Sequence, residues 1–508
     1  MDKKKFALTT AQVAACMAVL TVVTKVLAFV REMALANYFG AGVVTDAYAM
    51  AISIPNSLLA AAISAIGTSF MPAFSKKIET EGEDAAHKLT SKLLSLLFAL
   101  VAIVILFGEI FTGGLVKIFA PGFESETRTL TIFFLRFALF ILFYNVINYT
   151  YGAFLNYKNI FIPQIIYGFA QNSILIIFVV LAAKINAKLL IAGSLVGGFC
   201  MSLPHILRSK KEGFKFSFDL KIDDSVKTIL KEALPIFIGG YVTQINLAID
   251  RMLASKLVSG SVSALNYANQ IINTVSSLSI SIFIVILYPR LNKAYVTGGY
   301  KDMSRLSQKG VNVISILAMP FTLGIIFYAS PIIKLVFQRG AFDETAADLT
   351  AGALIFYAIG LLFTSLNALI TKVYYTMHDT LTCVKCSVTS VCINIALNFA
   401  LVGPMQHKGL ALATSISQFI NTCLLLYTFK KRYKYVNLIE SWGKLFKMLL
   451  FSTVSVGASY LLYTSFVTSI GLIPSIALGI VVAAGLYAAF LIIFKFEELV
   501  IIKDLIKK

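Results

Sequence analysis

Three charged residues interrupt the first long apolar stretch of the chain. Lys25, Arg31 and Glu32 fall inside the run 10–39, whose other residues are all uncharged. A charged side chain at the bilayer centre costs on the order of 3 kcal/mol, so such residues line a polar cavity or pair with each other. On a helix Lys25 and Glu32 share a face, because seven residues turn through about 700°. The run therefore holds either a Lys25–Glu32 pair with Arg31 reaching outward, or a cationic site that binds an anion such as a phosphate.

Other charged residues also fall within or beside apolar stretches. They are Asp46, Arg136, Asp250, Arg251, Lys372 and Lys385. Asp250 and Arg251 are neighbours on a helix and cannot face each other, so each needs another partner. Arg136 either ties two helices together or lines a cavity. Lys372 and Lys385 lie where long side chains reach the inner membrane surface.

Neither the cysteines nor the common phosphate-binding and zinc-protease motifs indicate a catalytic site in this sequence. The six cysteines all fall within or at the ends of apolar segments, where they are small core residues: Cys16, Cys200, Cys383, Cys386, Cys392 and Cys423. Cys383 and Cys386 have metal or redox spacing, but zinc needs about four ligands and His378 is the one nearby candidate. Neither GxxxxGK[ST] nor HExxH occurs, so ATP-driven pumping and zinc proteolysis lack their residues.

The composition shows which class of protein must position these charges. Of 508 residues 58% are apolar and 14% are charged, whereas soluble domains carry about 25% charge. The chain is therefore a membrane protein. Its 44 Lys and Arg against 25 Asp and Glu give a net charge of +19. In a membrane protein this excess indicates cytoplasmic loops beside anionic headgroups, and not a nucleic-acid partner.

Apolar stretches of about 20 residues, the length that spans a bilayer, predict an all-α integral membrane protein with fourteen transmembrane helices. They fall near 10–39, 43–74, 88–119, 126–156, 160–184, 188–208, 226–257, 261–288, 303–329, 345–376, 380–403, 408–430, 443–466 and 472–495. The first stretch is too long and too charged for a cleaved signal peptide, so we interpret it as a retained helix.

The loop charges indicate the orientation of these helices. With the N-terminus inside, the inner loops receive most basic residues, among them Lys76, Lys77, Lys210, Lys211 and the run 430–432. The outer loops hold few: Arg128, Lys184, Lys188, Lys334, Arg339 and Lys408. Because Lys and Arg concentrate on the cytoplasmic side, both termini are expected in the cytoplasm.

A weak internal repeat divides the chain into two halves. Arg31 to Gly40 and Arg251 to Gly260 share the same Arg–Gly separation, and each is followed by a long helix that reaches a proline before basic residues. The repeat offset spans six helices, so the halves have parallel topology. We predict an N-terminal lobe over 1–208, a cytoplasmic linker over 209–225, a second lobe over 226–430, and two extra helices with a tail over 431–508.

Several predicted helices also contain breaks. Pro55-Asn56, Pro163, Pro235 with Gly239-Gly240, and Pro320 interrupt or open helices. Such breaks free carbonyl groups and let a bundle bend, or they are simple packing kinks.

In this order, the motifs resemble the MviN/MurJ family of lipid II flippases. The resemblance lies in the stretch 25–48, in Ile54-Pro55-Asn56, and in further runs at 244–251, 260–269, 337–343, 374–380 and 408–415. It covers the chain to about residue 430. The family belongs to the superfamily of multidrug, oligosaccharidyl-lipid and polysaccharide exporters.

The resemblance implies fourteen helices, with two pseudo-symmetric six-helix lobes in a V around a central cationic cavity. It implies that helices 13 and 14 form a groove for a lipid tail. The implied activity is transport, not enzyme chemistry: export of the undecaprenyl-diphosphate-linked peptidoglycan precursor, lipid II, by alternating access. The implied location is the bacterial cytoplasmic membrane.

The resemblance also implies site residues. The expected substrate-binding residues are Lys25, Arg31, Glu32, Asp46, Asn56, Arg136, Arg251 and Gln270. Some family members bind sodium as a coupling ion, and the corresponding positions here are Asp250, Asn394, Asn398 and Thr414. Asn394 and Asn398 share a helix face, which suits coordination by oxygens or hydrogen bonding across helices.

Two departures reduce the positive charge of the expected cavity. Many family members carry an Arg pair and then Glu-Gly after the Pro-Asn of helix two, whereas the run 57–67 here has no charge. The family's cavity Arg in helix eight is Gln270 here. Arg136, Arg251 or Lys256 are candidates to compensate.

These departures keep two other transporter classes open. One is a flippase for another polyprenyl-diphosphate oligosaccharide, such as a capsule or O-antigen unit. The other is a cation-coupled multidrug exporter, in which acidic and aromatic cavity groups are expected to dominate. Lipid II and membrane lipids are the expected partners of a monomer that works alone or beside other cell-wall synthesis proteins. Export of an anion from a negative-inside cell gains about 2.3 kcal/mol per charge per 100 mV, so membrane potential alone is able to bias export, with or without a contribution from sodium or protons.

Overall fold

The computed structural model of the protein describes residues 10–158, 160–277, 281–433 and 437–498. In these ranges regular structure is helical throughout, with no strand. The long apolar stretches of the sequence form the helices, because a helix satisfies its own backbone hydrogen bonds where no water is present. The predicted all-α membrane fold is confirmed.

Contacts between residues divide the chain into two compact units, Met1–Ser263 and Ala264–Lys508. The first unit holds α1 (Thr10–Phe39), α2 (Val43–Pro55), a short π-helix η1 (Asn56–Ala60), α3 (Ala61–Glu81), α4 (Glu83–Ile110), α5 (Thr112–Phe119), α6 (Ser125–Ala138), α7 (Ile141–Tyr157), α8 (Ile162–Lys184), α9 (Leu189–Lys211) and α10 (Asp224–Ala254).

The second unit continues α11 (Ser261–Val275), which begins just before the boundary. It also holds α12 (Ser281–Val336), α13 (Glu344–Thr376), α14 (Thr380–Arg432), α15 (Trp442–Ile470) and α16 (Leu472–Ile493). The contact boundary lies after α10 because that helix packs along α3. The lobe limits derived from the repeat remain a prediction.

Ten helical segments of the described chain are long and apolar enough to cross a membrane. Two of the longest, α12 and α14, contain a residue with positive φ, Gly299 (φ 62°) and Gln406 (φ 52°) respectively. These residues separate stretches that the sequence predicts as different spans. The count of fourteen remains a prediction.

The break predicted at Pro55-Asn56 is a change of helix type. Pro55 ends α2, and the π-helical turn η1 follows at once. Proline cannot donate a backbone hydrogen bond, so a carbonyl in the preceding turn is left free. The Asn56 side chain donates to the carbonyl of Ile52 at 3.1 Å. Asn56 therefore satisfies backbone polarity next to the break.

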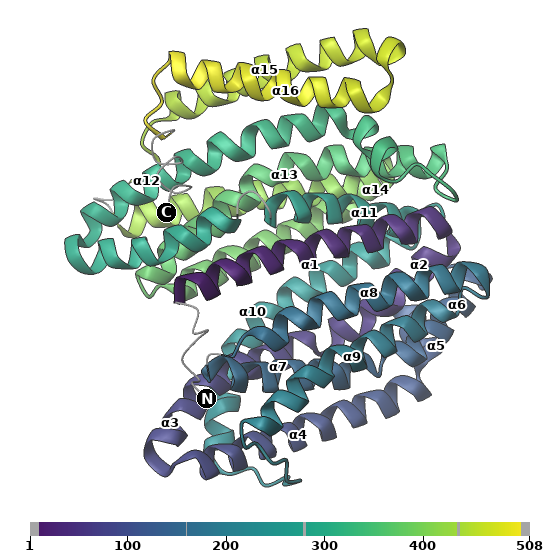
Figure 1. The fold of residues 1–508 in the computed structure, drawn as a ribbon, viewed down its shortest axis with the longest axis vertical. Helices are drawn as coiled ribbons and strands as arrows, with labels where there is room; N and C mark the ends of the chain where they lie inside the picture. The colour runs from purple at the N-terminus through teal and green to yellow at the C-terminus, as the bar shows by residue number, and fades with distance from the viewer. Residues whose placement is uncertain (1–9, 159, 278–280, 434–436, 499–508) are drawn as a thin grey trace, which may run out of the picture. The chain divides into compact units, whose positions relative to one another are not determined.

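The packing within each unit brings distant segments together. In the first unit α8 packs against α9 and against α1, and α3 packs against α4, α7 and α10. In the second unit α13 packs between α12 and α14, and α15 and α16 form a hairpin that contacts α12 (Figure 1). Gly471, with φ 85°, makes the tight turn of that hairpin, a backbone conformation that favours glycine.

Candidate functional site

Arg31 on α1 is half-buried and is held by two side chains. Its Nη2 donates to Oε1 of Glu32 at 2.5 Å, and its Nη1 donates to Oδ1 of Asn172 at 3.0 Å. Glu32 is buried, and its second oxygen, Oε2, has no hydrogen-bond partner in the described structure. The predicted cationic residue therefore lies in a polar cluster inside the first unit, paired with its neighbour in sequence.

Asn172 on α8 orients this cluster. Its side-chain Nδ2 donates to the carbonyl of Gly168 at 2.7 Å, which turns Oδ1 toward Arg31. Gly168 permits the close approach of α1, since a Cβ there would lie 2.3 Å from Cγ2 of Thr24. Asn172 is not among the residues predicted from the sequence. The available signal was an asparagine within the apolar run 160–184, which needs a hydrogen-bond partner in a membrane.

Lys25 does not form the pair with Glu32 that the sequence left open. Its side chain is exposed, and Glu32 pairs with Arg31 instead. Tyr48 lies close enough to Arg31 and Glu32 to interact with both electrostatically, and its hydroxyl shares a 2.7 Å hydrogen bond with Ser194. Tyr48 and Ser194 extend the polar cluster from α1 to α2 and α9.

Asp46 at the start of α2 is buried and fully engaged. Its carboxylate accepts hydrogen bonds from the backbone N–H of Gly260 and of Ser263, both at 2.7 Å, and from the Ser263 hydroxyl. Gly260 is required here: its φ is 90°, and a Cβ would lie 2.6 Å from the carbonyl oxygen of Ala41. The predicted substrate contact of Asp46 thus coincides with a structural role, because this carboxylate caps the first turn of α11.

The remaining predicted substrate residues lie elsewhere. Arg136 on α6 is exposed and lies 3.9 Å from Glu109 of α4, so it forms only a weak ion pair between the two helices. Asn56 serves the backbone beside η1, as described above. Arg251, like Asp250, lies in the last turn of α10, and Gln270 lies on α11 in the second unit. The Arg31 cluster thus includes Glu32 but neither Arg136 nor Asn56.

Three of the four predicted sodium residues lie on α14, while Asp250 lies on α10 of the other unit. Asn394 and Asn398 are buried, and the Asn398 amide donates to Oδ1 of Asn394 at 2.9 Å. Asn394 in turn donates to the Ser417 hydroxyl at 3.4 Å, and Ser417 donates to the carbonyl of Thr414 at 2.8 Å. These contacts join the three predicted residues into one chain of neutral oxygens and amides.

Other candidates have ordinary structural environments. Lys372 lies over the rings of Tyr288 and Tyr375, at 5.1 and 5.4 Å from their centres. Cys383 and Cys386 are buried thiols, and Cys386 contacts Thr428. No group of three or more His, Cys, Asp or Glu that could hold a metal occurs among the described residues.

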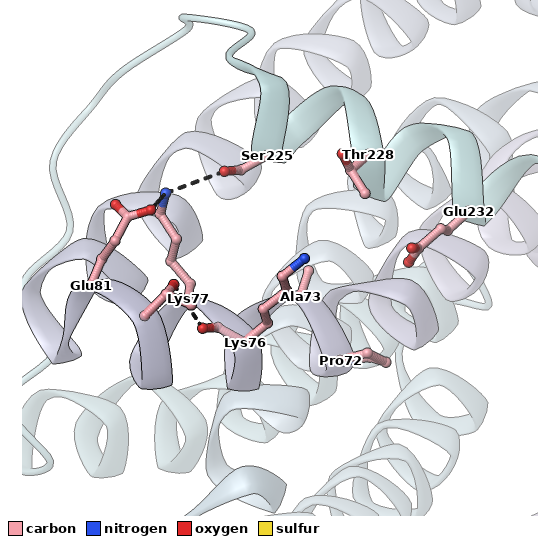
Figure 2. A pocket seen from close by; sticks show the side chains of 9 residues that line it. Pro72, Ala73, Lys76, Lys77, Glu81, Ser225, Thr228 and Glu232 are labelled. Carbon is pink, nitrogen blue, oxygen red and sulfur yellow. Dashed lines mark hydrogen bonds and ion pairs between the residues drawn. The ribbon is translucent and has the colours of Figure 1, made fainter.

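A polar pocket of about 240 Å³ lies between α3 and the start of α10 (Figure 2). Lys77 enters it, donating to Glu81 at 2.6 Å and to the Ser225 hydroxyl at 3.3 Å. Just before, Asp223 caps α10 by accepting from Val226 N–H at 3.0 Å. Burial alone raises the pKa of Asp223, but hydrogen bonds from Lys92 and from Val226 outweigh it and lower the pKa. The charged hydrogen bond between Lys92 and Asp223 therefore attaches the end of the predicted linker to α4 of the first unit.

Comparison with known proteins places these residues in a family. The family model described as "Lipid II flippase MurJ" matches residues 35–493. The probable lipid II flippase MurJ of Rickettsia prowazekii is 28% identical over 451 residues, which cover 86% of this chain and 87% of the relative. The lipid II flippase MurJ of Burkholderia cenocepacia is 27% identical over 427 residues, covering 81% and 82%.

Solved structures show the same fold. A lipid II flippase MurJ in an inward closed conformation superposes with a TM-score of 0.82 at 23% identity, covering 96% of this chain and 100% of that one. An inward-facing multidrug resistance MATE transporter of the MOP superfamily gives a TM-score of 0.64 at 12% identity, covering 82% and 95%. The family match includes α1 from Leu35 onward, so it begins four residues after Arg31.

Proposed function

Because the chain belongs to the MurJ family of lipid II flippases, we propose that it moves lipid II from the inner to the outer leaflet of the bacterial cytoplasmic membrane by alternating access. Members of this family are transporters, so the chain is not an enzyme. Its membrane character agrees with the ten helices that are able to span a bilayer. We place both termini in the cytoplasm, because basic loops concentrate on that side.

The observation that carries the proposal is the half-buried guanidinium of Arg31. A planar guanidinium matches the oxygens of a diphosphate with forked hydrogen bonds. In this structure Glu32 and Asn172 occupy part of that fork. A diphosphate that enters the site therefore competes with the Glu32 carboxylate for Arg31, and the same exchange offers a route for its release.

A second feature supports a ligand with a long apolar tail. An apolar pocket of about 520 Å³ lies within the second unit, lined by α12, α15 and α16 with Val275 of α11. Tyr328 and Ser459 share a 2.6 Å hydrogen bond, and Ser459 donates to the carbonyl of Gly479, which fastens the hairpin to α12. We propose that this pocket holds part of the polyprenyl tail, as the family resemblance implies for the last two helices.

The experiment that tests the function replaces the resident flippase. A bacterium depleted of its own lipid II flippase would express this chain, and lipid II on the outer leaflet would be measured by its accessibility to an added enzyme. We expect accessibility to return to the level given by a plasmid copy of the resident flippase. No recovery at equal membrane expression would reject lipid II, and recovery of O-antigen or capsule export instead would assign another polyprenyl-diphosphate substrate.

We also propose sodium as a coupling ion, held in part by Asn394, Asn398 and Thr414. The neutral oxygens along α14 fit a hard cation, which prefers oxygen ligands. Membrane potential acts on the anionic substrate whether or not sodium contributes, so sodium dependence needs its own test.

Sodium should raise the melting temperature of the purified protein relative to choline at equal ionic strength, because a ligand that binds the folded state stabilises it. We expect Asn398→Ala to remove this difference. Asn367→Ala is the matched control. Asn367 is another buried asparagine; it lies on α13 and forms hydrogen bonds with Gln418 and Thr422 of α14. An equal sodium shift in all variants would exclude this site.

A further inference from the structure

A concave basic pocket lies at the shared end of α15 and α16 in the second unit. It has a volume of about 360 Å³. One wall is the start of α15, with Ser441, Gly443, Lys444 and Lys447, and the other is the segment 494–496 that follows α16. The headgroup pocket, as we call this set, uses none of the residues assigned above to lipid II or sodium.

Both walls are held in place by local hydrogen bonds. The Ser441 side chain accepts from the backbone N–H of Lys444 at 3.4 Å and caps α15. On the other wall, Lys495 N–H donates to Ile492 O and Phe496 N–H donates to Leu491 O, each at 3.0 Å. This pair of bonds is a helix-ending motif that usually carries glycine at the position of Lys495.

Lys495 adopts a backbone conformation that costs energy for a lysine. Its φ is 51°, in the left-handed region. In the described chain, the other non-glycine residues with positive φ are His378 and Gln406. A strained residue that keeps a long charged side chain where glycine would fit better points to a use for that side chain.

The free charges of the pocket are positive. Lys444 already forms two ion pairs, because it donates to Glu498 at 2.6 Å and to Glu440 at 3.2 Å. Those two carboxylates also accept from Asn312; Glu498 is buried, whereas the Glu440 side chain is 47% exposed. Lys447 and Lys495 are exposed and form no ion pair with any described residue. The positive end of the α15 helix dipole adds to them.

The pocket lies at the level of a membrane interface. Both α15 and α16 are able to span a bilayer, and the pocket lies at their common end. Trp442, the one tryptophan of the chain, is 71% exposed there, together with Phe446 and Phe494. Tryptophan and other aromatic residues anchor helices at the headgroup level, and basic pockets between membrane helices bind phosphate-bearing headgroups.

We propose that the headgroup pocket binds the phosphate of an anionic phospholipid, with Lys447 and Lys495 as its cations. The ligand is a glycerophospholipid with net negative charge, of which phosphatidylglycerol is the simplest probe. We assign this phospholipid to the cytoplasmic leaflet, and that assignment rests on the proposed cytoplasmic location of both termini. Binding itself does not depend on the flippase activity, so failure of one proposal leaves the other standing.

The test is a lipid titration of the full purified chain in phosphatidylcholine nanodiscs. We expect added phosphatidylglycerol to raise the melting temperature, and native mass spectrometry to detect bound lipid. The double variant Lys447→Ala with Lys495→Gly should lose at least tenfold in apparent lipid affinity. Lys210→Ala with Lys211→Ala removes the same charge from the exposed end of α9 and should leave the affinity unchanged.

The single variant Lys495→Gly separates binding from structure. Glycine relieves the left-handed backbone, so the melting temperature without phosphatidylglycerol should rise, while the shift caused by that lipid should shrink. A parallel rise at every lipid concentration would overturn the proposal. Equal shifts from inorganic phosphate, or from phosphatidylcholine in place of phosphatidylglycerol, would overturn the assignment to an anionic lipid, as would binding of lipid II alone.

Discussion

Replacing Arg31 with alanine should abolish measurable lipid II transport. A hydrogen bond to a charged group contributes about 1.5–3 kcal/mol, and the guanidinium offers a diphosphate more than one such bond. The expected loss is therefore at least about tenfold to a hundredfold in transport at limiting lipid II, since every 1.4 kcal/mol is about tenfold. The measurement is the outer-leaflet accessibility of lipid II in flippase-depleted cells.

The structure adds a complication to this variant. Glu32 is buried and pairs with Arg31, so alanine at position 31 leaves a buried carboxylate without its cation. Removing one partner of a buried pair destabilises a protein by about 3–5 kcal/mol. The double variant Arg31→Ala with Glu32→Gln removes that charge, and it should be as inactive as the single variant while reaching normal membrane levels.

Two controls test the chemistry of the guanidinium. Arg31→Lys keeps the charge but not the planar fork, so it should restore only part of the activity. Arg136→Ala removes another membrane-helix arginine that is exposed and only loosely paired with Glu109. It should transport at close to the normal rate. Full transport by a well-expressed Arg31→Ala and Glu32→Gln protein would remove Arg31 from the substrate site.

The sequence predicted well what depends on local pattern. Apolar run lengths placed α1 and α13 within one residue of their ends, and the break at Pro55 lies where a proline removes a backbone donor. The charges inside α1 identified Arg31 as unusual before any partner was known. Each of these signals lies within a few residues of the feature it predicts.

What the sequence could not predict depends on pairs that are distant along the chain. Arg31 and Asn172 are 141 residues apart, and Asp46 and Gly260 are 214 apart. Helical periodicity gives the face that a residue occupies but not the helix it meets. Resemblance to a family suggested a substrate role for Asp46, whereas its partners are the backbone N–H groups of Gly260 and Ser263 and the Ser263 hydroxyl, more than 200 residues away along the chain.

Asp46→Ala should therefore cause a large loss of stability. It leaves the backbone N–H groups of Gly260 and Ser263 without their acceptor, and each unsatisfied buried group costs about 1–3 kcal/mol, whereas the Ser263 hydroxyl keeps its 2.8 Å hydrogen bond to Thr45. We expect about 3 kcal/mol or more, measured as a lower melting temperature and denaturant midpoint in detergent.

The matched control for this prediction is Asp343→Ala. Asp343 caps α13 through one bond, accepted from the backbone N–H of Ala346 at 2.8 Å, so its loss should cost only about 1 kcal/mol. Asp46→Asn should fall between the two, because an amide offers one acceptor oxygen but turns a donor toward the second N–H group. If Asp46→Ala melted like Asp343→Ala yet failed to transport lipid II, Asp46 would act on the substrate and not on the α10–α11 turn. Equal losses of stability and transport would instead show that the carboxylate supports transport by holding that turn.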